Sequence, residues 1–238
     1  MMRKNIVLVC FLVLLLAGGC ASKEKGVSPE GDSGWSEFVD KGVGQISRGN
    51  YQRGLEIMDT ALETEPENPR LYYNRGLCNA RLQNYAQAIQ DFSRAIELAP
   101  DFIRAYNNRA WTYYEMGEQE KAVEDLQQAL QKVGDSASIQ YNLGLIHAES
   151  GAHEKAIKNY TRAIGLRPSF AMAYNNRAVA RIQLGQHDKA LKDLEKANSL
   201  DPDIARYEYN IAVSLEEQGR PEKAVSHYTR AVQRDPGF

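Results

Sequence analysis

Apolar positions along this chain recur three and four residues apart, which is the spacing of one face of an α-helix. In 171–204, two such stretches lie on either side of Gly185, and Pro202 follows the second stretch. A glycine between periodic stretches favours a turn, and a proline cannot continue a helix because it has no backbone N–H. The segment therefore predicts two short amphipathic helices joined by a tight turn.

The same pattern returns every 34 residues from Trp35 to the last residue, with no insertion. A fixed period of this length predicts stacked structural units, each burying its apolar face against the next. The chain is therefore predicted to be all-α, with twelve helices in six units: 35–68, 69–102, 103–136, 137–170, 171–204 and 205–238. Three sets of residues hold fixed places in the units: Pro66, Pro100, Gly134, Pro168, Pro202 and Pro236; Ala61, Ala95, Ala129, Ala163, Ala197 and Ala231; and Gly49, Gly117, Gly151, Gly185 and Gly219.

With places counted from the first residue of each unit, the pattern resembles the tetratricopeptide repeat family. Place 20 is alanine from Ala88 to Ala224, place 27 is alanine and place 32 is usually proline. The resemblance implies a right-handed solenoid of helix-turn-helix repeats whose first helices line a concave groove, and it implies protein binding rather than catalysis. Two departures are Gly54, where alanine is expected, and Gly134, where proline is expected. Place 8 is small throughout: Gly42, Gly76, Ala110, Gly144, Ala178 and Ala212.

The first residues predict a secretory signal peptide over 1–19. Arg3 and Lys4 precede an apolar run from Ile6 to Leu16, which is too short to span a bilayer comfortably. Small residues directly before Cys20 resemble the lipobox of bacterial lipoproteins. That resemblance implies cleavage before Cys20 and acylation of this cysteine with palmitate-like chains. An ordinary secreted leader is the alternative interpretation.

Several acyl chains on one residue would hold the protein stably on its membrane. Residues 20–34 are polar and predict a flexible tether between the lipid and the repeats. By resemblance to Gram-negative lipoprotein sorting, Ala21 favours the outer membrane, facing the periplasm. The expected location is therefore the bacterial cell envelope, with the Gram type left open.

Charge and side-chain chemistry exclude several classes of function. Removing Arg3 and Lys4 with the leader leaves 27 basic against 31 acidic residues, which disfavours nucleic acid as a partner. Cys78 is expected to be a small apolar core residue, and the 34-residue separation of His153 and His187 indicates equivalent packing positions. No metal, cofactor or catalytic motif is recognised. Because repeats occupy 35–238, no room remains for a catalytic domain, and no enzyme is predicted.

Candidate binding residues come from the groove places that the family resemblance implies. Asparagine holds place 6 in five units, and an amide can both donate to and accept from a peptide backbone. The alternative is that this ladder only stabilises the repeats. Aromatic and arginine side chains at the other groove places are typical of recognition surfaces. The predicted peptide-binding residues are Asn74, Asn108, Asn142, Asn176, Asn210, Tyr73, Tyr141, Trp111, Tyr114, Arg70 and Arg104.

Charge at place 13 changes along the groove, from Arg81 to Glu115, Glu149 and Glu217. This gradient predicts a ligand with its own charge polarity, and a solvated charged face is an equally good interpretation.

The last unit ends at Phe238 with no further polar helix, so Ala224, Tyr228 and Ala231 are expected to stay partly bare. A homodimer through this end is a further hypothesis.

Together these patterns predict a membrane-anchored, non-enzymatic scaffold that binds peptides or helices of other envelope proteins. The combination of a lipid anchor and six repeats resembles the pilotin lipoproteins of type IV pilus systems, which escort a secretin to the outer membrane. It equally resembles lipoproteins that scaffold peptidoglycan hydrolases and envelope proteases. The sequence does not separate these alternatives.

Overall fold

The computed structural model describes residues 35–237, which fold into helices joined by short turns, without a strand in that range. The predicted leader 1–19, Cys20, the tether 20–34 and Phe238 lie outside the described residues. The all-α repeat fold is confirmed, and first helices begin 34 residues apart. The helices are α1 (Trp35–Ser47), α2 (Tyr51–Thr64), α3 (Pro69–Arg81), α4 (Tyr85–Leu98), α5 (Ile103–Glu115), α6 (Gln119–Val133), α7 (Ala137–Glu149), α8 (His153–Leu166), α9 (Ala171–Gln183), α10 (His187–Leu200), α11 (Ala205–Glu217) and α12 (Pro221–Arg234).

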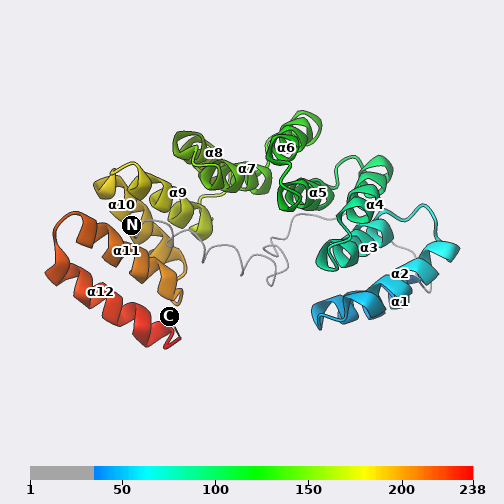
Figure 1. Ribbon diagram of the computed structural model, residues 1–238, viewed down its shortest axis with the longest axis horizontal. Helices are drawn as coiled ribbons and strands as arrows, with labels where there is room; N and C mark the ends of the chain where they lie inside the picture. The colour runs from blue at the N-terminus through cyan, green and yellow to red at the C-terminus, as the bar shows by residue number, and fades with distance from the viewer. Residues whose placement is uncertain (1–34, 238) are drawn as a thin grey trace.

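The helix pairs follow one another along an arch, from α1 and α2 at one end to α11 and α12 at the other (Figure 1). Each helix packs on its neighbours in sequence. Each odd-numbered helix also comes close along its backbone to the next odd-numbered helix. Among residues 35–237 the even-numbered helices do not approach one another in this way, although the Arg234 side chain of α12 reaches Asn198 of α10. The odd-numbered helices therefore line the inner, concave side of the arch.

The turn between the helices of a repeat needs one residue in the left-handed backbone region. Gly185 has a φ of 68°, and the backbone N–H of the next residue donates to the carbonyl of Arg181 at 2.8 Å, which closes the end of α9. Repeat two departs from this pattern, because Gln83 occupies the same position with a φ of 62°. A side chain is strained in that conformation, so this turn is the least favourable of the set.

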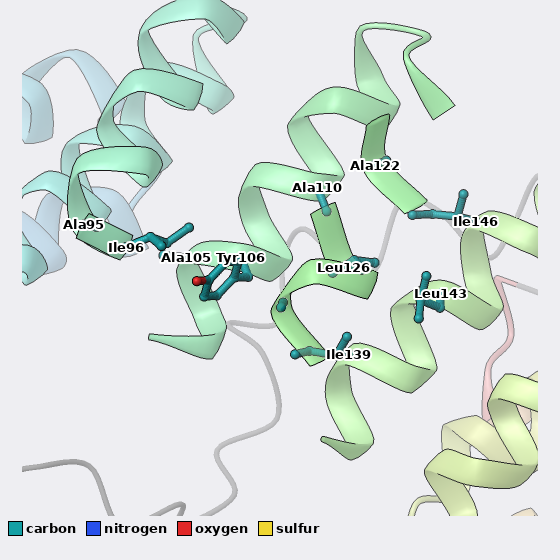
Figure 2. Close-up of a cluster of buried hydrophobic side chains, with 11 residues drawn as sticks. Ala95, Ile96, Ala105, Tyr106, Ala110, Ala122, Leu126, Ile139, Leu143 and Ile146 are labelled. Carbon is teal, nitrogen blue, oxygen red and sulfur yellow. The ribbon is translucent and has the colours of Figure 1, made fainter. Parts of the chain in front are cut away.

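In repeats three and four, the residue at place 8 matches the size of the side chain that it faces across the helix pair. Gly144 faces the ring of Tyr160, and a Cβ added there would lie 2.5 Å from a ring carbon. Repeat three has the complementary choice: Ala110 and Leu126 are both fully buried in the same cluster. Figure 2 shows this cluster, in which Leu126 of α6 lies between α5 and the apolar face of α7. Packing of this kind fixes the distance between paired helices.

The C-terminal end corrects one sequence expectation. Ala224 and Ala231 are 2% and 1% exposed, not partly bare, because their places face the partner helix α11 within the same repeat. The apolar side chains that do reach solvent on α12 are Val225 and Val232, at 63% and 51% exposure. They occupy places that face the following repeat elsewhere in the arch.

Candidate binding groove on the concave face

The asparagines of place 6 mostly bond to the preceding repeat. Asn108 Nδ2 donates to the hydroxyl of Tyr73 at 3.1 Å and to the carbonyl of Arg104 at 2.9 Å. Asn176 Nδ2 donates to the hydroxyl of Tyr141 at 2.9 Å. These bonds tie consecutive odd-numbered helices together, so the ladder has a structural role.

The other three asparagines differ in environment. Asn210 is buried, and its Nδ2 donates to Asn175 Oδ1 at 2.8 Å. Asn74 is also buried, and Asn142 is half-buried; within residues 35–237 neither side chain makes a hydrogen bond. Of the five, Asn142 thus combines solvent access with donors that no other described residue uses. Whether any of them holds a peptide stays a prediction.

The two predicted tyrosines of place 5 are held by aromatic packing as well. Tyr73 lies 4.9 Å from Phe102 between ring centroids, and Tyr141 lies 4.8 Å from Phe170. Burial raises the pKa of Tyr73, and the nearby Arg104 charge and the hydrogen bond from Asn108 lower it by less. These rings therefore form the floor of the groove more than its contact surface.

Trp111 and Tyr114 form the aromatic surface that remains accessible. Both are half-buried on α5, and their rings stack with centroids 5.0 Å apart. The pKa of Tyr114 is raised by burial, and then by the carboxylates of Glu149 and Glu115. Flat aromatic surface beside negative charge suits a cationic or amphipathic ligand segment.

The groove has charged edges of opposite sign over repeats three and four, whereas Arg81 makes both edges basic in repeat two. Arg70 and Arg104 are exposed at the start of their helices, on one edge. Glu115 is exposed and Glu149 is half-buried near the ends of α5 and α7, on the other edge. A segment lying along the arch would meet both edges at once.

Sequence analysis missed a set of arginine–aspartate pairs that joins the two helices of a repeat. In repeat five, the guanidinium of Arg177 donates to both carboxylate oxygens of Asp193 at 2.7 and 2.8 Å, and also to the hydroxyl of Thr161 in the repeat before. A bidentate pair of this type fixes geometry as well as charge. The arginines, and likewise the aspartates, recur at multiples of 34 residues along the chain, and this recurrence could have predicted the pairs. The equivalent pairs are Arg75–Asp91 and Arg109–Asp125.

Repeats four and six replace this pair by other polar groups. In repeat four, the half-buried Asn159 donates from Nδ2 to Gln140 Oε1 at 2.9 Å, and its Oδ1 lies 2.9 Å from His147 Nδ1. In repeat six, the buried carboxylate of Glu208 accepts from His227 at 2.7 Å and pairs with Arg230 and Arg234 at 3.1 Å. Burial raises the pKa of Glu208, but the hydrogen bonds from His227 and Arg230 and the charge of Arg234 outweigh it, so the pKa is lowered.

The described residues hold no cluster of three or more histidine, cysteine or acidic side chains that could bind a metal ion. Cys78 is fully buried, and burial together with Asp91 and Asp59 raises the pKa of its thiol to about 12. It is therefore a core residue with little thiolate character. Across 35–237, none of the helices has the length and apolar character to cross a bilayer.

Solved structures with the same architecture have been described. MamA is 26% identical with a TM-score of 0.59, covering 68% of this chain and 95% of that one. YrrB, described as a TPR protein with an unusual peptide-binding site, is 21% identical with a TM-score of 0.58, covering 75% and 92%. Pseudomonas aeruginosa pilF is 17% identical with a TM-score of 0.71, covering 86% and 93%.

Sequence comparison assigns the family directly. No curated protein sequence matches the chain. Family models described as tetratricopeptide repeat match residues 43–102, 92–124 and 169–236, and one described as TPR repeat matches 111–151 and 146–185. The matches run through all the described repeats, with the helix pairing and arch that this repeat forms. The chain belongs to the tetratricopeptide repeat family.

Proposed function

We propose that this protein is a non-enzymatic scaffold of the bacterial cell envelope that binds extended segments or helices of partner proteins in its concave groove. The family and the fold support a protein–protein interaction scaffold. The single observation that carries the choice of surface is the accessible Trp111–Tyr114 stack between edges of opposite charge. Ring surface with polar surroundings is where binding energy concentrates in interfaces.

Groove binding is tested by affinity purification of the full-length protein from solubilised membranes. The groove variant carries W111A and Y114A, and a matched control carries K158A and E195A on exposed positions of even-numbered helices α8 and α10. Specific partners are expected to be lost from the groove variant and retained by the control, with helicity checked by circular dichroism. Retention of every partner by the groove variant would contradict the proposal.

We also propose that lipid on Cys20 holds the protein on its membrane. The support is in the sequence alone: a short apolar leader followed by small residues and Cys20. Labelling with radioactive palmitate and fractionation of membranes test it directly. A C20S variant is expected to lose both the label and the membrane association, and a labelled or membrane-bound C20S protein would contradict the anchor.

A second candidate is a pilotin-like assembly factor for a type IV pilus secretin. What favours it is that the structural match with Pseudomonas aeruginosa pilF covers 86% of this chain and 93% of that one, so the shared fold extends over most of both chains. At 17% identity this likeness concerns the fold, and the candidate needs its own test. Loss of secretin from the outer membrane on deletion of the gene would support it, and normal secretin assembly would favour the other candidate, a scaffold for peptidoglycan hydrolases or proteases.

The proposed partners include a second copy of the chain, docked on the exposed side of α12 in the last repeat. Val225 and Val232 are exposed there, and Tyr228 lies between them on the helix. Analytical ultracentrifugation of the wild type and a V225E/V232E variant tests this. A concentration-dependent dimer that the variant abolishes is expected, and a wild type that stays monomeric at tens of micromolar would refute it.

A further inference from the structure

A hollow opens on the concave face between repeats four and five. About 420 Å³ of space, part of it open solvent, lies there at the junction of α7, α8 and α9. Leu145, Ala148, Val179 and Ala180 supply carbon walls, while Glu149 and His153 bring polar atoms to it. The hollow is adjacent to the Trp111–Tyr114 surface, since the charge of Glu149 is close enough to raise the pKa of Tyr114.

Comparison between repeats explains why the hollow is open. Val179 stands at the place that Trp111 holds in repeat three, so a much smaller side chain occupies the same position. Ala180 stands at the place that Ser214 holds in repeat six, where the serine hydroxyl lies 3.4 Å from His187 Nδ1. Compared with Trp111 of repeat three and Ser214 of repeat six, the side chains of Val179 and Ala180 are smaller and leave this space open.

The second of these substitutions also leaves a polar atom without a partner. His153 holds the place of His187 one repeat earlier, but faces alanine where His187 has serine. Its Nδ1 is buried and makes no hydrogen bond within the described residues. A buried polar atom with no partner carries a desolvation cost that a ligand donor or acceptor would remove.

Glu149 gives the hollow its charge preference. The side chain is half-buried, and within residues 35–237 it forms no salt bridge with a lysine, arginine or histidine. Burial raises the pKa of its carboxyl, since a charge leaving water is disfavoured unless an opposite charge approaches. His153 and Tyr160 also line the hollow, and the carboxylates of Glu149 and Glu115 both act on the adjacent Tyr114, so the acidic charge on this side repels an anionic ligand.

We propose that this hollow binds one basic side chain, lysine or arginine, of the segment held in the groove. The aliphatic stem would lie on Leu145, Val179 and Ala180, and the cation would meet the Glu149 carboxylate. Long basic side chains favour such sites because stem and head have opposite preferences for water. The proposal deepens the groove function above and rests on it, since it names the residue class that the partner segment must carry.

The test begins with a phage-displayed library of random dodecapeptides, selected against the full-length protein in detergent. Groove-directed peptides are identified as those that W111A/Y114A no longer binds. Synthetic versions are then titrated by fluorescence anisotropy against wild type, E149Q and V179W, with E195Q on the exposed face of α10 as the matched charge-neutralising control. V179W installs the side chain that repeat three already carries, so it blocks the hollow with a residue that the fold accepts.

Groove-directed peptides are expected to share a lysine or arginine whose replacement by norleucine weakens binding about tenfold, the size of a charge-assisted hydrogen bond. E149Q and V179W are expected to weaken the basic peptides by a similar factor, and E195Q less than twofold. Groove-directed peptides without a shared basic residue, or insensitive to both E149Q and V179W, would overturn the inference while leaving the groove function standing. If no selected peptide depends on W111A/Y114A, groove binding itself fails, and this inference fails with it.

Discussion

Replacing Gly144 by alanine perturbs the closest helix approach in repeat four. The added Cβ would lie 2.5 and 2.6 Å from two ring carbons of Tyr160, whose side chain is 1% exposed and so has little room to move. Overpacking of a rigid ring costs about 3 kcal/mol, the upper part of the usual range, whereas alanine in place of glycine favours the helix by about 1 kcal/mol. We therefore expect G144A to lower the free energy of unfolding by about 2 kcal/mol.

The assay is urea unfolding followed by circular dichroism, with two comparisons built into it. G165A is the matched control, because nothing lies within 4 Å of a Cβ added at Gly165 on α8, so only the helix-propensity gain of about 1 kcal/mol applies. In a Y160L background, which copies the Ala110–Leu126 arrangement, G144A is expected to stabilise by the helix-propensity gain of about 1 kcal/mol, giving a coupling energy of about 3 kcal/mol. A G144A variant as stable as wild type, or equally costly in both backgrounds, would refute the reasoning.

Three further predictions follow from other residues. Q83G is expected to stabilise the protein by about 1 kcal/mol, since glycine removes the strain of a φ of 62°; a loss of stability in thermal melts would contradict this. Cys78, with a thiol pKa of about 12, should resist iodoacetamide at pH 8 until the protein is unfolded, and rapid labelling by peptide mapping would show that the site opens. The lowered pKa of Glu208 means that its stabilisation is present above the ordinary value of 4.5 and is lost as pH falls through the folded value. E208Q should thus be less stable than wild type at pH 7 and approach it in acid; a constant difference would exclude this linkage.

The regular features of the fold were predictable because they follow from local chemistry repeated at one spacing. Apolar periodicity, the turn glycine at Gly185 and the small residue at Gly144 each specify a helix, a turn or a close approach without knowledge of distant residues. The pairing of Gly144 with Tyr160 also lies within one repeat. The repeat pattern of the sequence was therefore enough to predict the helices, the turns and the pairing of helices within a repeat.

The candidate site was predictable only as positions along the groove. The sequence places Asn108 and Asn176 at place 6, but their hydrogen bonds to the tyrosines of the preceding repeat depend on how two helices lie side by side. The Arg177–Asp193 pair was visible as a 34-residue recurrence that the sequence analysis did not use. The hollow exists because Val179 and Ala180 have small side chains. A small residue in an apolar pattern does not by itself indicate an open space in the sequence.

The central claim is that partners bind on the concave face, and site-specific photocrosslinking in the native membrane tests it most directly. A photoreactive phenylalanine analogue replaces Tyr114, whose ring shape it preserves, and in a separate strain replaces Glu124, which is exposed on α6 on the other side of the arch. The account predicts that partner proteins crosslink at position 114 and not at position 124. Crosslinking at position 124 alone, or to the same partners at both positions, would contradict the account.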